Sequence, residues 1–292
     1  MRTTADGVAD GRVRNCAVLG SPIAHSLSPV IHQAAYRYLE LEWTYTAYEV
    51  DEPDLAGFVA GLDHSWRGLS LTMPLKRVAL DVADDASGLA RTVGAANTLI
   101  RADDGRLFAD NTDVPGFMGA LGERGIGTPD AKPGTVCVWG GGATAASVLA
   151  ALATLDAGTT HLHARSAQRA KEALELAEAL GRPAGYVPWE VADVCATSEL
   201  TVNTAPAGAL DPFAEALTTN VNGERALFDV LYEPWPTPLA ARWAQAGGIV
   251  LGGLDLLVHQ ALGQVRLMTG HDVPVDVLRD AAQRALSLRT RT

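Results

Sequence analysis

The chain has little cysteine, and its cysteines are scattered. Cys16, Cys137 and Cys195 are an odd number, and no Cys-x-x-Cys pair occurs in the 292 residues. This usage predicts neither a disulfide framework nor a zinc site, and it favours a reducing, cytoplasmic setting. His161 and His163 form a His-x-His pair without a neighbouring cysteine, so we expect no metal there.

Basic clusters are absent as well. The chain has 23 Lys and Arg against 34 Asp and Glu, a formal net charge of −11, and no stretch collects the basic residues. A nucleic-acid backbone needs a clustered basic face, so the sequence excludes nucleic acid as a partner. A small anion can still bind, because one or two placed cations or a helix N-terminus suffice.

Long hydrophobic runs are missing too. The longest, residues 143–155, is interrupted by Thr144 and Ser147 and falls short of the roughly 20 residues of a membrane span. The opening MRTTADGVADGRVRN lacks the apolar centre of a signal peptide. We therefore expect no membrane partner and a flexible extension over residues 1–13.

The residues that are present suit a folded α/β protein. The chain is 48% apolar and 20% charged, enough for buried cores, and its length predicts one large domain or two ordinary ones. In the first third, strands are expected at 15–19, 43–50 and 66–71, helices at 29–39, 53–62 and 75–83, and a hairpin at 98–101 and 106–109. The hairpin turn is Asp103-Asp104-Gly105, a strong turn signal.

A second series of strands and helices follows residue 134. Strands are expected at 135–139, 160–163, 200–203, 226–230 and 249–251, and helices at 114–123, 144–155, 170–180 and from 253 to the end. Strands that alternate with helices predict parallel sheets in an α/β architecture. We place the domain boundary near residues 111–113 and expect the last helices to return to the first domain.

A glycine-rich turn lies between the strand at 135–139 and the next helix. Gly140-Gly141-Gly142-Ala143-Thr144-Ala145 approximates the G-x-G-x-x-G pattern, with alanine in the third slot. In a dinucleotide site the first glycine permits the turn, the second lets the backbone approach a pyrophosphate, and the helix N-terminus faces the phosphates. The alternative is a glycine-rich turn without a ligand.

The residues after the next strand favour NADP over NAD. An NAD site carries an acidic residue there for the ribose 2′-hydroxyl, whereas this chain has Arg165 and Arg169. Arginine can pair with a 2′-phosphate through two hydrogen bonds and can stack on adenine. The alternative is that Arg165 is a solvated loop residue and Arg169 a surface residue of a helix.

Lys76 and Asp113 are candidates for acid–base chemistry. Lys76 is expected in the first turn of a helix, where the helix dipole opposes its charge, although such lysines often simply point to water. Asp113 lies at the expected domain junction, where either Thr112 or Asp113 could instead cap a helix. Hydride transfer to a ketone requires a proton donor, and a lysine oriented by a carboxylate can serve.

These motifs occur in an order that resembles the shikimate dehydrogenase family. The segments are GSPIAHSLSP, LTMPLK, GAANTL, DNTD, the glycine turn, ARSAQR, DVLYEPWPTPL and GGLDLLVHQA, from about residue 15 to the last helix. The resemblance implies reversible, NADPH-dependent reduction of 3-dehydroshikimate to shikimate, in the biosynthesis of chorismate and the aromatic amino acids. It also implies an N-terminal substrate-binding domain with a mainly parallel sheet, residues 14–112 completed by 252–292. A Rossmann-like NADP-binding domain, residues 113–251, would follow, with a cleft between the two.

The resemblance implies a role for each matching residue. Lys76 and Asp113 would be the catalytic pair. Substrate would be bound by Ser26, Ser28, Thr72, Asn97, Tyr232 and Gln260, with the two serines and Tyr232 at the carboxylate. NADP would be bound by Gly140, Gly142, Ala143, Arg165, Ser166, Arg169 and Gly253.

The segment GSPIAHSLSP suggests a physical reason for the serines. Ser28 and Pro29 have the order expected for the N-cap and first residue of a helix. The helix N-terminus would then attract the substrate carboxylate, and the hydroxyls of Ser26 and Ser28 would bind the same anion. We expect no catalytic role for His25.

The chain departs from the family pattern at a few positions. Ser70 and Ala164 stand where asparagine is common, and Ala205 stands where a hydroxyl is usual. Asp255 and Leu256 stand where the family often has a small or polar residue and methionine. The loss at Ala164 removes one side-chain hydrogen bond, which would weaken NADP binding without changing the preference.

Other functions remain open on the sequence. A related enzyme could act on quinate or an amino-shikimate, depending on the room around Ser26, Ser28 and Tyr232. A non-catalytic NADP-binding sensor is a second alternative, against which the intact Lys76 and Asp113 argue. A reductase for protein-bound or tRNA-bound substrates would need a basic docking surface, which the net charge does not suggest. The expected partner is a small molecule, and the expected state is a monomer or homodimer.

Overall fold

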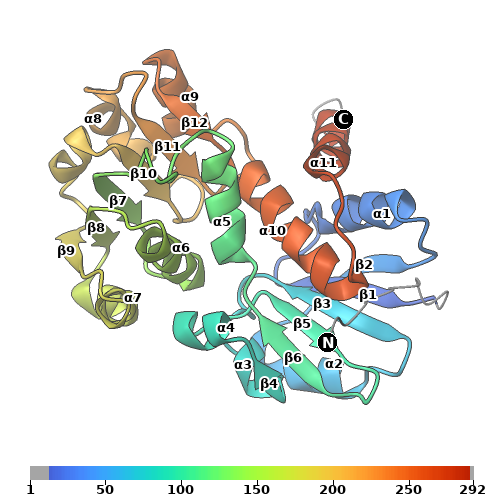
Figure 1. Ribbon diagram of the computed structural model, residues 1–292. Helices are drawn as coiled ribbons and strands as arrows, with labels where there is room; N and C mark the ends of the chain where they lie inside the picture. Colours follow the sequence, from blue (N-terminus) through green and yellow to red (C-terminus); the bar gives the residue numbers. More distant parts are fainter. Residues whose placement is uncertain (1–12, 290–292) are drawn as a thin grey trace. The chain divides into compact units, whose positions relative to one another are not determined.

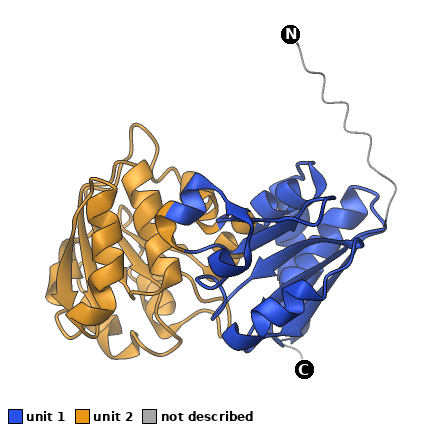
Figure 2. Ribbon diagram, turned by 90° about the horizontal axis from the view of Figure 1, so that it is seen from below, with its two compact units in different colours: residues 1–91, 95–112, 261–292 blue, residues 92–94, 113–260 orange. Residues whose placement is uncertain are grey.

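The computed structural model describes residues 13–289, which divide into two compact units (Figure 2). The first unit comprises residues up to 91, 95–112 and those from 261, and the second comprises 92–94 and 113–260. The chain thus leaves the first unit after Thr112 and re-enters it inside its penultimate helix. Apart from Val13, the expected extension over residues 1–13 lies outside the described residues.

The first unit contains a six-stranded sheet in the order β2-β1-β3-β5-β6-β4 (Figure 1). Its strands are β1 (Asn15–Gly20), β2 (Thr44–Glu49), β3 (Trp66–Leu71), β4 (Asp85–Ala86), β5 (Thr98–Arg101) and β6 (Leu107–Asp110). Among these, β5 alone runs antiparallel to its neighbours, so the expected mainly parallel sheet is confirmed. The apolar run of β1 is buried because the strand lies between β2 and β3.

Helices pack on this sheet and close its core. They are α1 (Ser28–Tyr38), η1 (Glu52–Asp54), α2 (Leu55–Ala60), α3 (Ala79–Val82), α4 (Gly88–Val93) and α11 (Val275–Arg289), with the second half of α10 (Gly253–Thr269). α1 packs along α11, so the last helix returns to the N-terminal part of the chain. Leu19, Leu69 and Leu99, from three neighbouring strands, are fully or almost fully buried in one cluster.

The second unit contains a six-stranded, all-parallel sheet in the order β12-β11-β10-β7-β8-β9. Its strands are β7 (Thr135–Trp139), β8 (Thr159–Ala164), β9 (Ala184–Pro188), β10 (Leu200–Asn203), β11 (Ala226–Asp229) and β12 (Ile249–Leu251). Its helices are α5 (Asp113–Gly122), α6 (Ala143–Thr154), α7 (Ala167–Ala179), η2 (Asp193–Thr197), η3 (Asp211–Phe213), α8 (Ala214–Thr218) and α9 (Pro238–Gln245). Counted from its first strand this is the order 3-2-1-4-5-6, which confirms the expected Rossmann-like fold.

The local structure expected around Lys76 is wrong. The helix expected at 75–83 is limited to Ala79–Val82, and Lys76 lies in a turn. The backbone there forms hydrogen bonds that a helix would not: Leu75 N donates to Thr72 O (2.8 Å), and Ala96 N donates to Lys76 O (2.7 Å). The argument that a helix dipole opposes the charge of Lys76 therefore does not apply.

The expectation that the cysteines form no disulfide is also wrong. Cys137 on β7 and Cys195 on η2 are bonded, with their Cα atoms 5.8 Å apart. His163 Nε2 lies 3.0 Å from Cys195 Sγ, so two sulfurs and a ring nitrogen form a buried cluster. The disulfide leaves neither sulfur as a thiolate, the form that binds a metal.

Within residues 13–289, none of the helices is both long and apolar enough to cross a membrane.

Candidate active site

A cavity of about 380 Å³ opens at the carboxyl edge of the second sheet. It is lined by Gly140, Gly141, Gly142, Ala164, Arg165, Arg169, Trp189, Thr204, Ala205 and Pro206. Most of these residues directly follow β7, β8, β9 or β10. β7 lies between β8 and β10, where the strand order reverses, and doubly wound sheets bind ligands at that place.

The first and third glycines of the turn differ in what the fold allows at each position. Gly140 has a φ of +118°, and a Cβ there would collide with Thr204 Oγ1, so the fold itself demands glycine. Gly142 has a φ of −91°, and a Cβ there would meet nothing within 4 Å. Because the protein leaves that space open, the absence of a side chain at Gly142 suits a ligand that approaches the backbone closely.

The N-terminus of α6 lies at the same cavity and gives it a positive electrostatic potential that favours an anion. Gly142 is the N-cap of α6, and no side chain caps it in the described structure. The first N–H groups of the helix, including that of Ala143, are therefore not satisfied by the helix itself and favour an anion. Gly141 packs close to the start of α7, because a Cβ there would lie 2.7 Å from Arg169 O.

Two arginines supply positive charge to the cavity. Arg165 follows β8 directly, and Arg169 lies in the first turn of α7; both are exposed. Ser166 is the N-cap of α7, and its Oγ accepts a hydrogen bond from Arg169 N (3.3 Å). No lining residue is acidic, so this part of the chain suits a dinucleotide with a 2′-phosphate better than one with a free 2′-hydroxyl.

Gly253 is not among the residues that line this cavity. It begins α10, and a Cβ there would collide with the carbonyl oxygen of Val230. Close packing therefore explains this glycine, and its expected contact with NADP stays a prediction.

In the first unit, three segments that carry predicted site residues lie at one edge of the sheet, and residues 111–112, which directly precede Asp113, lie at the same edge. Ser26 and Ser28 follow β1, Thr72 and Lys76 follow β3, and residues 111–112 follow β6, all at the carboxyl ends of strands that run in one direction. Asn97 precedes β5, which runs the opposite way, so it lies at the same edge. The topology alone thus places five predicted site residues at the same edge of the sheet: Ser26, Ser28, Thr72, Lys76 and Asn97.

The loops at this edge are tied to one another. Thr72 N donates to Leu19 O (2.9 Å) and Ser21 N donates to Met73 O (3.0 Å), which joins the segment after β3 to the end of β1. Gly20 permits this approach, since a Cβ there would collide with the methyl group of Thr72.

Asn97 is buried and held by several hydrogen bonds. Its Oδ1 accepts from Thr112 N (2.8 Å) and Thr98 Oγ1 (2.9 Å), and its Nδ2 donates to Thr112 Oγ1 (2.9 Å). Gln264 Nε2 donates to Asn97 O (3.1 Å) and to Thr98 Oγ1 (3.2 Å). Gln264, which we did not predict, therefore helps to hold the Asn97 segment; its spacing of four residues from Gln260 on one helix was the available signal.

The network continues into the core behind Asn97. Gln264 Oε1 accepts from Ser70 Oγ (2.8 Å) and lies 3.2 Å from His32 Nε2, and Tyr45 OH donates to Ser70 Oγ (2.6 Å). Burial lowers the pKa of His32 to about 3, so its ring is neutral near neutral pH. Ser70, where the family often has asparagine, is thus a core hydrogen-bonding residue here.

The helix start in GSPIAHSLSP differs from expectation. Ser28 is the first residue of α1 rather than its N-cap; the N-cap is Leu27, without a side-chain hydrogen bond. Ser26 Oγ accepts from Ser28 N (3.3 Å), so Ser26 performs part of the capping. Ser28 is buried, and both serines lie at the helix N-terminus as the anion interpretation requires.

Asp113, Tyr232 and Gln260 belong to the second unit. Asp113 begins α5 and is 4% exposed. Gln260 lies where α5 and α10 pack closely, because a Cβ on Gly116 would be 2.7 Å from Gln260 N.

The loop of Tyr232 is anchored by a buried carboxylate. Asp229 ends β11 and accepts hydrogen bonds from Asn203 Nδ2 (3.0 Å), Thr237 Oγ1 (2.7 Å) and Leu231 N (3.2 Å). Burial raises the pKa of Asp229. These bonds fix the path of the chain on both sides of Tyr232.

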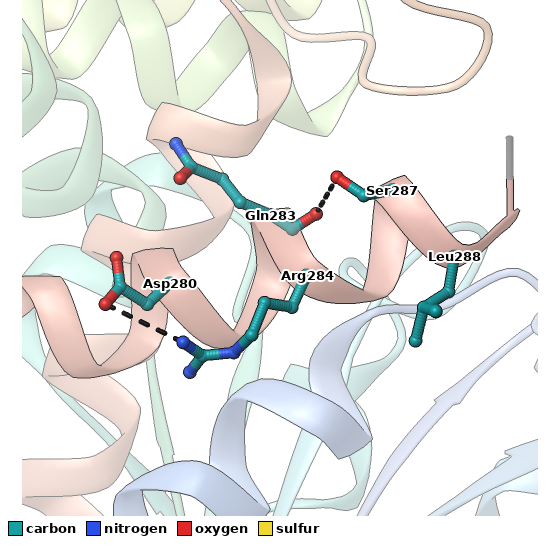
Figure 3. Close-up of a pocket in the computed structure, with 5 residues that line it drawn as sticks. All are labelled: Asp280, Gln283, Arg284, Ser287 and Leu288. Atoms are coloured by element: carbon teal, nitrogen blue, oxygen red, sulfur yellow. Dashed lines mark hydrogen bonds and ion pairs between the residues drawn. The ribbon is translucent and has the colours of Figure 1, made fainter.

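A second cavity, of about 520 Å³, is lined by residues of α11 (Figure 3). They are Asp280, Gln283, Arg284, Ser287 and Leu288. Arg284 pairs with Asp280 at 3.9 Å, and Ser287 Oγ donates to Gln283 O (2.9 Å). These contacts are ordinary for an exposed helix face, and no predicted site residue lies there.

Comparisons with known proteins give the family. A family model for the shikimate dehydrogenase substrate binding domain matches residues 18–99, and one for the shikimate 5′-dehydrogenase C-terminal domain matches residues 253–283. A shikimate dehydrogenase (NADP(+)) of Thermus thermophilus is 38% identical over 274 residues, covering 93% of this chain and 98% of the relative. The chain belongs to the shikimate dehydrogenase family.

Solved structures of the shikimate dehydrogenase family agree with the fold. The Thermus thermophilus shikimate 5-dehydrogenase in complex with NADP(H) and shikimate has a TM-score of 0.81 at 36% identity, covering 93% of this chain and 99% of that one. A quinate dehydrogenase from Corynebacterium glutamicum in complex with NAD has a TM-score of 0.82 at 25% identity, covering 94% and 99%. The fold is therefore shared by relatives with different substrates and cofactors, and the residues of the site must distinguish them.

Proposed function

We propose that the protein is an NADP-dependent shikimate dehydrogenase that interconverts 3-dehydroshikimate and shikimate in chorismate biosynthesis. The observation that carries the cofactor choice is the cavity at the switch point, with an open Gly142, two arginines and no acidic lining residue. The substrate choice rests on family membership and on the match of Ser26, Ser28, Thr72, Asn97, Tyr232 and Gln260 to the family motifs.

Each proposed residue has a chemical task. When bound, NADPH supplies the hydride that reduces the substrate carbonyl carbon. Lys76 donates the proton that converts the carbonyl oxygen to a hydroxyl, and Asp113 holds the ammonium group in place. In the reverse direction Lys76 accepts that proton.

The remaining residues recognise a small polar ring. Ser26, Ser28 and Tyr232 bind the carboxylate at the N-terminus of α1, where the helix dipole favours an anion. Thr72, Asn97 and Gln260 bond the ring hydroxyls. A site that bonds hydroxyls rejects analogues without them strongly, because its own buried polar groups would stay unpaired.

The cofactor residues divide by the part of NADP that they meet. Gly140, Gly142 and the N–H of Ala143 receive the pyrophosphate. Arg165, Ser166 and Arg169 bind the 2′-phosphate end, and Gly253 lies at the nicotinamide end.

Lys76→Ala tests the catalytic assignment. We expect turnover with shikimate to fall at least about a hundredfold, since general acid–base catalysis contributes that much or more, while the Kd for NADP stays nearly unchanged. Lys171→Ala is the matched control, because Lys171 is exposed on α7 and pairs only weakly with Glu175 at 3.7 Å. Unchanged turnover of Lys76→Ala would exclude this role, and inactive wild type that still binds NADP would favour a sensor.

We also propose a cytoplasmic enzyme that acts as a monomer or homodimer without nucleic-acid or membrane partners. The net charge of −11 and the scattered basic residues support the first exclusion. Light scattering on the purified chain measures the oligomeric state, and a mass above that of a dimer would contradict the proposal.

A further inference from the structure

Trp189 is a residue of the cavity that neither the sequence motifs nor the family match assigns. It follows β9 directly, and β9 pairs with β8 so that Pro188 lies opposite Ala164. The residues next in the chain, Trp189 and Arg165, therefore emerge side by side at the carboxyl edge of the sheet. Both line the cavity.

The two side chains are in contact. The guanidinium carbon of Arg165 lies 5.7 Å from the centroid of the Trp189 ring, within the range of a cation–π interaction. Tryptophan is the aromatic residue that attracts a cation most strongly. Arg165 is otherwise exposed, so this ring is the feature of its surroundings that restricts it.

The Trp189 ring is itself held in place. It meets Trp139 edge to face, with centroids 5.1 Å apart and planes at 85°, and it meets Phe213 at 6.4 Å and 79°. Trp139 is fully buried on β7. The half-buried Trp189 ring is therefore held by its packing against the core, and its contact with Arg165 restricts the motion of that exposed side chain.

We propose that Trp189 is a positioning residue that preorients Arg165 for the 2′-phosphate of NADP and thereby contributes to the preference for NADP over NAD. The inference rests on the proposed function, because it takes the dinucleotide to be NADP. An exposed arginine loses rotamer freedom when it binds a phosphate, and a guanidinium restricted beforehand loses less. NAD has no 2′-phosphate, so it gains nothing from this orientation.

The test measures Kd for NADP and for NAD by calorimetry on the full chain without substrate. We expect Trp189→Leu to reduce the NADP-over-NAD affinity ratio about two- to fivefold, as the loss of an exposed cation–π contact predicts. Trp189→Phe, which keeps an aromatic face and the packing on Trp139, should retain most of the ratio. In an Arg165→Ala background, Trp189→Leu should leave the ratio unchanged.

The possible results distinguish the assignment of NADP as the cofactor from the role of Trp189. A wild-type chain with no preference for NADP would overturn the cofactor assignment and this inference with it. A wild-type preference that Trp189→Leu leaves intact, or equal losses of affinity for NADP and NAD, would overturn the role of Trp189 alone. Thermal unfolding of each variant shows whether the second unit still folds. If Trp189→Leu does not fold, Trp189→Met takes its place, because it keeps apolar bulk against Trp139 without an aromatic face, and a wild-type ratio in that variant would overturn the role of Trp189.

Discussion

Gly140 and Gly142 are two residues apart, yet the structure gives them opposite constraints. Gly140 is fixed by its positive φ and by Thr204, whereas Gly142 has an ordinary φ and empty space where a Cβ would lie. From the sequence motif, Gly140 was expected to permit the turn and Gly142 to let the backbone approach a pyrophosphate. The structure shows that the fold itself requires glycine at Gly140, whereas at Gly142 the missing side chain leaves open space that suits a ligand.

This difference predicts opposite effects of substitution. Gly142→Ser should fold as stably as the wild type or slightly better, because serine is a good N-cap, while the Kd for NADP rises at least about tenfold as the side chain enters the cavity. Gly140→Ala should lower the free energy of unfolding by about 1–3 kcal/mol, because alanine is strained at this φ and collides with Thr204. Denaturant unfolding and calorimetry measure the two quantities, and a Gly142→Ser chain with unchanged NADP affinity would contradict the site.

At the scale of single residues, the sequence indicated candidate catalytic and binding residues, but it did not indicate which side chains lie next to one another in the fold. Lys76 and Asp113 were predicted from their places in the chain together with the family resemblance, and Asn97 from the resemblance alone. Gln264 was missed because its one signal was its spacing of four residues from Gln260, and Trp189 was missed because an aromatic residue after a strand has no local signal. Their importance comes from what the fold places next to them.

Among the elements, α1 begins one residue earlier than the sequence predicted, and the proposed anion site does not depend on that detail. The sequence predicted Ser28 as the N-cap, but the helix begins one residue earlier and Ser26 accepts the hydrogen bond from Ser28 N. The helix N-terminus still faces the carboxyl edge of the sheet, because α1 follows β1. That position is enough for the helix N-terminus to attract an anion.

Ser26→Ala and Ser28→Ala should raise KM for shikimate more than they lower kcat. The hydroxyls are proposed to bind a carboxylate that does not react. Their loss therefore weakens the binding of the substrate and of the transition state by the same amount, which raises KM and leaves kcat nearly unchanged. Steady-state kinetics measure the two constants. A fall in kcat with unchanged KM would show that neither serine binds the carboxylate as proposed.

The disulfide joins β7 to η2, and the sequence did not predict it because the two cysteines are 58 residues apart. Cys195 lies on η2, just before β10, and only the folded chain brings η2 next to Cys137 on β7. Cys137 and Cys195 are at most 1% exposed, which shields the bond from reductants. In the chain-entropy model a loop of this length stabilises the fold by about 4 kcal/mol.

Thiol titration in denaturant tests this bond. Without reductant we expect one reactive thiol per chain, that of Cys16, and three after reduction. Cys16→Ser should give none before reduction. Three thiols in unreduced wild-type protein would show that Cys137 and Cys195 are not bonded.

On the scale of the whole molecule, the alternation of strands and helices was enough to predict two α/β units. β10 and β12 were predicted to the residue, since short apolar runs between turn signals have sharp ends. β9 was missed because it is a partly exposed edge strand with Gly185 and Pro188, and α9 was missed because its short amphipathic pattern follows a proline-rich stretch. The helix expected around Lys76 failed because a hydrogen bond from Ala96 holds the chain in a turn.

As a shikimate dehydrogenase, this chain should oxidise shikimate with NADP. The most direct measurement is kcat/KM of the purified protein for shikimate and for quinate, each with NADP and with NAD, followed by the absorbance of the reduced nicotinamide. We predict the highest value for shikimate with NADP. A value for quinate with NAD at least about tenfold higher than for shikimate with NADP would contradict the account.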